Sequence, residues 1–322
     1  MPSIEPSTTI EKILSLPEFA PMRGQFVSSA TDWFRGKGSR TLRDLQAEQP
    51  TWSAADMAYG LNRLLAVARR GKPYVLPLES GARLVALPAD EPRHHTCCLL
   101  LAGGAYGAVC TMVEALPVAA RLNELGVDCC CLNYHTATAQ SMVCGLMPQP
   151  LDDVAAAVRH LMATQPGRPY ALAGFSAGGH VCALWGTRHL GARSRDLPQP
   201  VALLLDYPLT SLAAIPAGPI KDYLLQGLFG TGHNSRHTEA YSVPAHVDAA
   251  YPPTWLERAA DDTTVPQQDT RDMVAALEGA GVPHHLEAMA SGGHGFGLGS
   301  HTPAKGWAER AWAWMTETVG EG

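Results

Sequence analysis

The sequence lacks the features that mark a membrane-spanning, secreted or nucleic-acid-binding protein. Its 322 residues contain no apolar run of about 18 residues, the length that spans a bilayer. The N-terminal segment has neither a basic start nor an apolar stretch, so we expect no signal peptide. The net charge of -6 lacks the excess of lysine and arginine that nucleic acids and anionic membranes attract. These absences predict a cytoplasmic protein whose partners are neither nucleic acid nor membrane.

Paired metal-ligand motifs are also missing. The eight cysteines form no C-x-x-C pair, and the adjacent histidines at 94–95 and 284–285 have no zinc-ligand spacing. Five cysteines, at 97–98 and 129–131, stand in apolar stretches of strand character, where a thiol acts as a small buried hydrophobe. Adjacent residues of a strand point to opposite faces and do not readily bridge one another. We therefore expect reduced thiols and no bound metal.

Apolar residues are abundant and are arranged in a regular alternation. Hydrophobic residues make up 46% of the chain and charged residues 17%, which is typical of a globular protein. Strands are expected at 74–77, 83–87, 96–102, 127–132, 170–173, 201–205, 254–259 and 284–289. Helices are expected at 113–125, 151–162, 181–185, 267–277 and 303–318. This alternation predicts an α/β fold with a mainly parallel central sheet covered by helices on both faces.

One short segment joins the end of a buried strand to the start of a helix. Residues 174–178 read Gly-Phe-Ser-Ala-Gly and follow the apolar run at 170–173. A sharp turn from strand to helix leaves no room for side chains two residues from its apex, which explains the glycines around Ser176. At such an apex the serine oxygen is exposed in a strained conformation, and the amides of the following helix favour negative charge. Ser176 is therefore the predicted nucleophile.

Two further groups are needed to activate this serine: a base, usually histidine, and a carboxylate that orients it. Of the thirteen histidines, His294 alone stands in a loop with glycines on both sides, between an expected strand and the last helix. The acid is expected just beyond the strand at 254–259, at the edge where open α/β sheets build their sites. Asp262 is our first choice there, and Asp261 is the alternative. The order serine, acid, histidine is that of the α/β-hydrolases.

Backbone amides are needed to stabilise the negative oxygen of a tetrahedral intermediate. One is expected from Ala177, the residue after the nucleophile. Others are expected from the loop after the strand at 96–102, which reads Leu-Ala-Gly-Gly-Ala-Tyr-Gly over residues 101–107. Its glycines allow the backbone to approach a substrate closely.

Two parts of the chain depart from the strand and helix alternation. Residues 1–72 are predicted to form an N-terminal helical extension, a candidate cap over the active-site mouth. Within it Ser53 caps a helix with an apolar stripe, whereas 32–49 is predicted to be irregular. Residues 73–322 are the expected catalytic domain, and the proline- and glycine-rich segment at about 209–249 is an expected lid insertion.

Several of these segments together resemble bacterial α/β-hydrolases of the acetyl-esterase and xylan-esterase-like group, related to the hormone-sensitive-lipase type. The segments are 102–106, 132–134, 174–180, 241–247, 252–254, 261–266 and 293–296. The resemblance covers about residues 75–319. It implies an α/β-hydrolase fold with Ser176 as nucleophile, His294 as base and Asp262 as the acid that orients it.

The resemblance also implies roles for other residues of the same motifs. The implied oxyanion donors are Gly104, Ala105 and Ala177. The residues predicted to contact substrate are Tyr106, Phe175 and Phe296. In the lid, His233 and His237 are further candidates, whereas His180 is interpreted as structural. Ala105 stands where glycine is usual, and its methyl group narrows the acyl pocket, so a small acyl group such as acetyl is expected.

The sequence thus predicts a serine hydrolase that cleaves a small-molecule carboxylic ester through an acyl-enzyme, without a cofactor. Acyl transfer to an alcohol or amine, as in an acyltransferase or a cyclising tailoring enzyme, needs the same three residues and remains an alternative. Peptide cleavage is disfavoured, because 72 residues cannot build the propeller that related peptidases carry. A binding-only protein is disfavoured because all three residues are retained.

Overall fold

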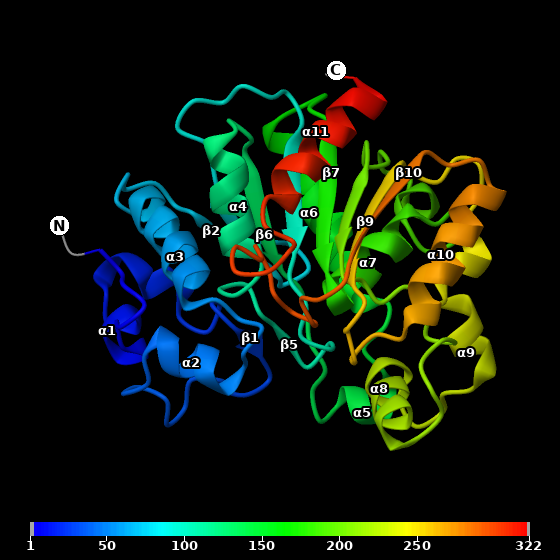
Figure 1. Cartoon of the computed structure of the whole chain (residues 1–322), viewed down its shortest axis with the longest axis horizontal. Coiled ribbons are helices and arrows are strands. Elements are labelled where there is room, and N and C mark those ends of the chain that lie inside the picture. The colour runs from blue at the N-terminus through cyan, green and yellow to red at the C-terminus, as the bar shows by residue number, and fades with distance from the viewer. Residues whose placement is uncertain (1–2, 321–322) are drawn as a thin grey trace.

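The computed structural model describes residues 3–320 and is built around one eight-stranded sheet (Figure 1). Its strands lie in the order β10-β9-β8-β7-β4-β6-β3-β2. Their bounds are β2 (Val75–Pro77), β3 (Arg83–Leu87), β4 (Cys97–Leu101), β6 (Cys129–Asn133), β7 (Tyr170–Phe175), β8 (Leu203–Asp206), β9 (Thr254–Ala259) and β10 (His284–Met289). β4 and β6 to β10 run parallel, whereas β2 and β3 add an antiparallel edge. The predicted α/β fold with a mainly parallel sheet is confirmed.

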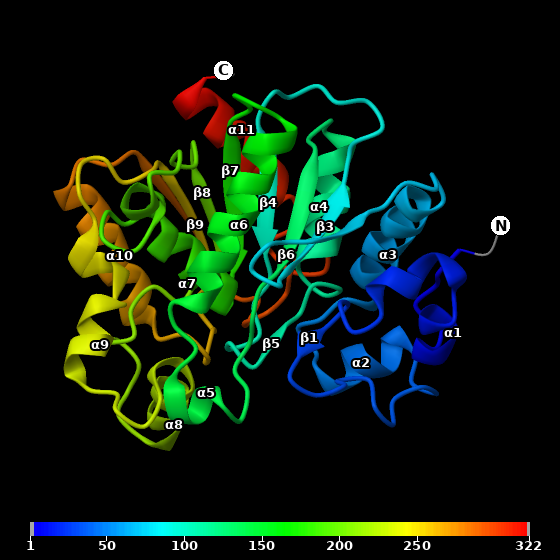
Figure 2. The same ribbon diagram turned by 180° about the vertical axis from the view of Figure 1, so that it is seen from behind.

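Helices cover both faces of the sheet, which explains why its central strands are apolar on both sides. α4 (Ala115–Glu124) and α11 (Trp307–Val319) lie on the face that is in front in Figure 1. α6 (Gln149–Thr164) and α7 (Ser176–Gly186) lie on the other face, as the view from behind shows (Figure 2). α10 (Gln267–Gly279) follows β9 and packs beside β10. As a result, every residue of β4 and β7 is buried.

The residues before β2 form a layer of short helices beside the antiparallel edge of the sheet (Figure 1). The layer comprises α1 (Ile10–Leu14), the 3₁₀ helix η1 (Pro17–Met22), α2 (Leu42–Glu48) and α3 (Ala54–Ala68). α3 begins after Ser53, whose side chain accepts the backbone N–H of Asp56, and it packs on α4. The irregular segment predicted at 32–49 is wrong in its second half, because Thr41 and Asp44 cap each other across the first turn of α2.

The N-terminal layer is joined to the loop that follows β4. β1 (Ser28–Ser29) pairs antiparallel with β5 (Ala108–Val109). Just beyond this pair, the N–H of Met112 donates to the carbonyl oxygen of Phe26 at 2.8 Å. Phe26 and Met22 belong to the same buried core as the strands of the sheet. The layer therefore packs on the sheet as part of one core.

The segment between β8 and β9 lies at the carboxyl ends of the parallel strands. It contains α8 (Pro219–Phe229), α9 (Ser235–Ala240) and the 3₁₀ helix η3 (Val243–His246). α8 packs against the short α5 (Ser141–Cys144), which follows β6, so two connections meet over one end of the sheet (Figures 1 and 2). The remaining 3₁₀ helix, η2 (Ala192–Arg195), follows α7.

Two further features of the structure concern the state of the cysteines and the length and polarity of the helices. All eight cysteines are free, and burial raises the pKa of the Cys98 thiol well above its ordinary value. Within residues 3–320, no helix combines the length and the apolar character needed to cross a bilayer.

Candidate active site

Ser176 lies at the junction between β7 and α7. Its φ of +50° is in the left-handed region, which costs a residue with a side chain about 1 kcal/mol or more. Close packing explains the glycines of this turn. A Cβ on Gly178 would lie 2.1 Å from the carbonyl oxygen of Leu101, and one on Gly174 would lie 2.8 Å from the Cα of Gly179. The surrounding backbone therefore forces the turn that holds the serine hydroxyl in place.

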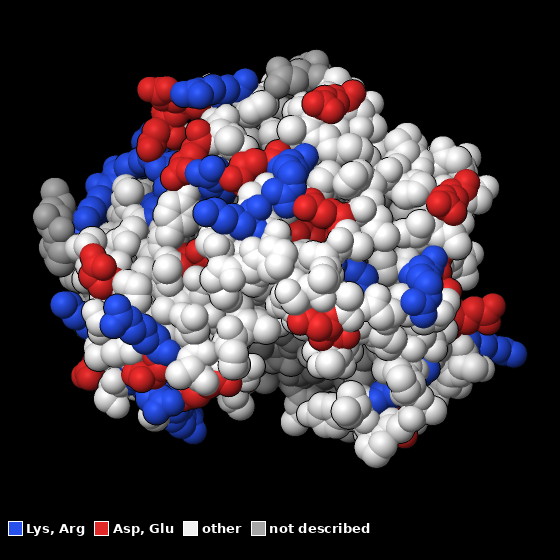
Figure 3. Space-filling view, viewed as in Figure 1, with Lys and Arg blue, Asp and Glu red and all other residues white. Residues whose placement is uncertain are grey.

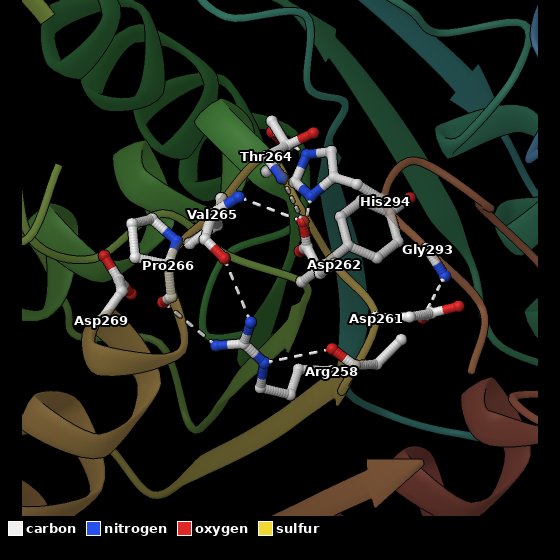
Figure 4. Close-up of polar contacts among 12 residues, drawn as sticks. Arg258, Asp261, Asp262, Thr264, Val265, Pro266, Asp269, Gly293 and His294 are labelled. Carbon is white, nitrogen blue, oxygen red and sulfur yellow. Dashed lines mark hydrogen bonds and ion pairs between the residues drawn. The ribbon is translucent and has the colours of Figure 1, made fainter. Parts of the chain in front are cut away.

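His294 lies between Ser176 and Asp262, with one ring nitrogen facing each. Nε2 is 2.8 Å from the hydroxyl oxygen of Ser176, and Nδ1 is 2.8 Å from Oδ2 of Asp262. With the Nδ1 proton directed to the carboxylate, Nε2 is left to accept the proton of the hydroxyl. Figure 4 shows the contact between His294 and Asp262. The fold thus brings together three residues that the sequence places in separate motifs.

The two adjacent acids have different partners. The Asp262 side chain is 1% exposed, and its Oδ1 accepts the N–H groups of Thr264 at 2.7 Å and Val265 at 3.0 Å. Asp261 instead accepts the N–H of Gly293 at 2.8 Å (Figure 4). Asp261 therefore steadies the loop that carries His294, whereas Asp262 contacts the imidazole itself.

Sequence reasoning missed Arg258, which holds the loop of the acid. Its buried guanidinium donates to the carbonyl oxygens of Val265 at 3.1 Å and Pro266 at 3.2 Å (Figure 4). It also donates to the hydroxyl of Thr270 at 2.8 Å. The signal that would have found it is an arginine inside a strand expected in the parallel sheet, because a buried guanidinium needs several acceptors.

The predicted oxyanion donors lie in the loop after β4 and in the first turn of α7. Gly104 and Ala105 have left-handed φ angles of +133° and +51°, and the carbonyl oxygen of Gly104 accepts the N–H of Ala108 at 3.0 Å. Between residues 3 and 320, no hydrogen bond uses the N–H of Gly104 or Ala105. Ala177 lies in the first turn of α7, where N–H groups have no partner within the helix. These amides are available to an oxyanion.

A cavity of about 480 Å³ opens beside Ser176. Its larger lining side chains include Met142, Leu209, Ile220, Leu224, Leu228 and Val265. No charged side chain lines it in the part of the chain that the structure describes. Ile220 and Tyr223, which also line the cavity, are 84% and 71% exposed, an unusual exposure for large apolar side chains.

The space-filling view agrees with this description. On the face shown in Figure 3, the surface is hollowed between the N-terminal layer and the lid segment, and most atoms around the hollow are uncharged. Acidic and basic side chains are interspersed elsewhere on that face. This face therefore shows no extended patch of one charge.

Two of the three aromatic residues predicted to contact substrate lie behind the site. Phe175 is fully buried and packs edge-on against Trp307, while Phe296 packs against Tyr207 with ring centres 4.6 Å apart. Neither lines the cavity, so their contact with substrate stays a prediction, and the contacts seen here are packing contacts. Tyr106 does line the cavity.

The other histidines considered in the sequence do not line the cavity. His180 is buried between the Tyr106 hydroxyl and the carbonyl oxygen of Tyr241, and burial lowers its pKa to about 4. His237 stacks on Phe229, and neither it nor His233 lines the cavity. Among the described residues, no group of three or more His, Cys, Asp or Glu side chains is arranged to hold a metal ion.

The lid insertion was predicted from the sequence, but the residues of it that line the cavity were not. Ile220, Leu224 and Leu228 are spaced four residues apart on α8, so they form one face of that helix. This spacing is the signal that would have placed them together. It was hidden because the proline- and glycine-rich composition of the segment suggested a loop.

Sequence comparisons agree with this architecture over part of the chain. The model of the prolyl oligopeptidase family matches residues 221–322, which include Asp262 and His294. Endo-1,4-beta-xylanase B of Butyrivibrio fibrisolvens is 24% identical over 224 residues, or 66% of this chain. The chain spans only 34% of the length of that relative.

Solved structures match a larger share of the chain than these sequence comparisons do. The acetyl ester-xyloside bifunctional hydrolase of Caldicellulosiruptor lactoaceticus is 28% identical, with a TM-score of 0.63 over 79% of this chain and 92% of its own. Esterase 2 of Thermogutta terrifontis is 19% identical, with a TM-score of 0.63 over 77% of this chain and 95% of its own. The carboxylesterase Cest-2923 of Lactobacillus plantarum is 20% identical, with a TM-score of 0.59 over 75% of this chain and 94% of its own. The resemblance found in the sequence is confirmed at the level of the fold: the chain has an α/β-hydrolase fold, and its structural neighbours include esterases.

Proposed function

We propose that this protein is a serine esterase that hydrolyses a carboxylic ester of a small molecule. The observation that carries the proposal is the line of contacts from the Ser176 hydroxyl through His294 to Asp262, 2.8 Å at each step. This is the arrangement that a nucleophile, its base and the orienting acid require. The structural neighbours named as esterases and as an acetyl-ester hydrolase support the same chemistry.

In the first half of the reaction the acyl group moves to the enzyme. His294 Nε2 takes the hydroxyl proton while Oγ of Ser176 bonds to the ester carbonyl carbon. Negative charge develops on the carbonyl oxygen and is stabilised by the N–H groups of Gly104, Ala105 and Ala177. His294 then gives the proton to the leaving alcohol, and the acyl group remains on Ser176.

In the second half water releases the acyl group. His294 takes a proton from a water molecule, and the resulting hydroxide bonds to the acyl carbon at the same site. The bond between that carbon and Oγ of Ser176 breaks as His294 returns the proton to the serine. Throughout both halves Asp262 stabilises the imidazolium without taking its proton. No step in this sequence calls on a metal or cofactor.

The shape and polarity of the site support a compact acyl group on an apolar alcohol. Ala105 lines the cavity together with Ser176, and its methyl group takes up space that a glycine would leave to the acyl chain. The cavity offers apolar surface but no charged side chain, so it suits an uncharged, apolar alcohol. Initial rates on p-nitrophenyl esters from acetyl to decanoyl should be highest at acetyl, and a maximum at long chains would contradict this substrate class.

A fluorophosphonate probe tests the nucleophile. The wild-type protein should be labelled covalently and the Ser176→Ala variant should not be, because the probe reacts with an activated serine. Removing a triad serine costs about a million-fold in turnover, so ester hydrolysis should disappear in the same variant. Ser194→Ala, in the 3₁₀ helix η2 and outside the cavity lining, is the control that should keep both labelling and turnover. Equal labelling of wild type and Ser176→Ala would contradict the proposal.

Acyl transfer is the second candidate. The apolar cavity beside Ser176 could hold an acceptor alcohol or amine after the first product leaves, and the same three residues would then activate the acceptor in place of water. Product analysis with and without added alcohols distinguishes the two reactions. Free acid as the dominant product in both cases supports hydrolysis.

A further inference from the structure

Glu114 is a buried acid that the proposed mechanism does not use. It immediately precedes α4 and is 4% exposed, yet its side chain does not cap that helix. Instead its Oε2 accepts the N–H of Gly103 at 2.5 Å, and its Oε1 accepts the hydroxyl of Tyr207 at 3.1 Å. Gly103 directly precedes Gly104, so this acid holds the loop that carries the oxyanion donors.

Tyr207 extends these contacts to the loop of the histidine. It directly follows β8, is buried, and has a left-handed φ of +36°. Its hydroxyl oxygen accepts the N–H of Gly297 at 2.9 Å, and its ring centre is 4.9 Å from that of His294. Trp307 Nε1 donates to the carbonyl oxygen of Gly297 at 3.0 Å. The backbone three residues after His294 is thus held through both its N–H and its carbonyl group.

The directions of these hydrogen bonds follow from the groups involved. A backbone N–H can only donate, so the Tyr207 oxygen accepts from Gly297 and directs its own proton to Glu114. Both oxygens of Glu114 then accept, which suits an ionised carboxylate. The pKa of Glu114 lies above its ordinary value, because burial raises it more than the N–H of Gly103, the charge of protonated His294 and the Tyr207 hydroxyl lower it.

Both loops are packed closely against the residues of these contacts. A Cβ on Gly103 would lie 2.8 Å from the Cβ of Ser176, and one on Gly297 would lie 2.6 Å from the carbonyl oxygen of Val113. Val113 directly precedes Glu114, so the histidine loop touches the backbone next to the acid. A displacement of Glu114 is therefore transmitted to both loops.

We propose that Glu114 and Tyr207 are positioning residues, which form a buried bridge that holds the oxyanion loop and the histidine loop at a fixed separation around Ser176. The inference rests on the proposed ester hydrolysis, because the separation matters only if both loops act on one reacting carbonyl. A misplacement of about 1 Å can cost about a hundredfold in rate. The bridge acts on turnover rather than on substrate binding, since neither Glu114 nor Tyr207 lines the cavity.

Two variants interrupt the bridge with little change in shape. In Glu114→Gln one oxygen becomes an NH₂ group, so either the N–H of Gly103 faces another donor or the Tyr207 hydroxyl loses its acceptor. Tyr207→Phe removes the hydroxyl but keeps the ring that packs on His294. We expect kcat to fall about 10- to 100-fold in each variant, with KM changed less than about threefold. The double variant should lose about as much as the worse single variant, because both changes break one chain of contacts.

Asp128→Asn is the matched control. The Asp128 carboxylate also joins a backbone N–H, that of Ala89 at 2.8 Å, to a side chain, that of Arg168 at 2.8 Å, but at the opposite ends of the strands. This variant should lower the melting temperature and leave kcat unchanged. If the two bridge variants behaved in the same way, folded and less stable but with wild-type kcat, the proposal would be overturned. Tyr207→Phe decides the question if Glu114→Gln does not fold.

The rate of phosphonylation of Ser176 separates this inference from the proposed function. The fluorophosphonate reaction needs the activated serine and the oxyanion amides but no particular ester. We expect the wild type to react, and both bridge variants to react about 10- to 100-fold more slowly. A wild type that neither reacts nor hydrolyses esters would contradict the proposed function and the bridge with it. A wild type that reacts, with both variants equally fast, would contradict the bridge alone.

Discussion

At the scale of single residues, the neighbouring acids Asp261 and Asp262 have different expected roles. Asp262→Asn should lower kcat about ten-thousand-fold. An amide does not keep the imidazole proton on Nδ1, the arrangement that leaves Nε2 able to accept the proton of Ser176. Asp261→Asn keeps an oxygen that accepts the N–H of Gly293, so it should lower kcat less than about tenfold. Steady-state kinetics on p-nitrophenyl acetate, corrected by active-site titration, measures both. Similar losses in the two variants would contradict the assignment of Asp262.

Residues that constrain the backbone could be recognised from the sequence, whereas residues that act through tertiary contacts could not. Ser176 and His294 stand among glycines, which indicate tight turns. The turns that hold these two residues can therefore be recognised from the sequence. Phe175 was predicted to contact substrate from its place next to the nucleophile, but successive residues of a strand point to opposite faces, and its ring packs against Trp307. Glu114 and Tyr207 carry no local signal. Their partners are 11 and 90 positions away along the chain, and only the fold brings them together.

At the scale of elements, α8 supplies one wall of the cavity and exposes two large apolar side chains at its N-terminal end. Ile220 and Tyr223 cover little protein surface, so a bound apolar alcohol would bury them further. Composition predicted an insertion between β8 and β9, but the helix and its cavity face depend on packing against α5, which is distant in sequence.

Shortening the exposed side chains of α8 should weaken the binding of large alcohols. Burying a side chain of this size contributes about 1 kcal/mol or more, so Ile220→Ala and Tyr223→Ala should each raise KM for 1-naphthyl acetate by about fivefold. KM for methyl acetate should change little, because its alcohol does not reach α8. Met162→Ala removes an exposed apolar side chain on α6, away from the cavity, and is the control. Equal changes for both esters would contradict a role of α8 in binding the alcohol.

At the scale of the whole molecule, the sheet could be predicted from its apolar strands, but the placement of the N-terminal layer could not. The central parallel strands β4 and β7 are apolar runs that are each followed along the chain by a helix, and this pattern is local. The layer is joined to the oxyanion loop by β1 and β5, which are two residues long and carry no pattern. Its packing against the sheet depends on contacts between distant parts of the chain.

The sheet also carries three acids side by side on neighbouring strands. Asp206 on β8 is in register with Glu257 on β9, which is in register with Glu287 on β10. Glu287 pairs with Arg310 at 2.6 Å, but the carboxyl oxygens of Asp206 and Glu257 have no hydrogen-bond partner in the described part of the chain. Burial, and then repulsion from Glu257, raises the pKa of Asp206. Burial, and then repulsion from Glu287, raises the pKa of Glu257.

These raised pKa values predict that stability falls as the pH rises above the ordinary range of a carboxyl group. In that window the unfolded chain releases the Glu257 proton while the folded chain keeps it, so each pH unit costs about 1.4 kcal/mol for such a group. Glu257→Gln should remove this part of the pH dependence and raise the free energy of unfolding at pH 8 relative to the wild type. Urea unfolding between pH 5 and pH 8, with the exposed Glu317→Gln as control, measures the effect. Parallel pH curves for wild type and Glu257→Gln would contradict it.

The most direct test of the proposed chemistry is to trap the acyl-enzyme. The protein is mixed with p-nitrophenyl acetate, quenched with acid within a single turnover, digested and analysed by mass spectrometry. We predict one acetyl group on the peptide that contains Ser176 in the wild type, and none on that peptide in Ser176→Ala. Continued turnover with no acetylated peptide, or with the acetyl group on another residue, would contradict the account.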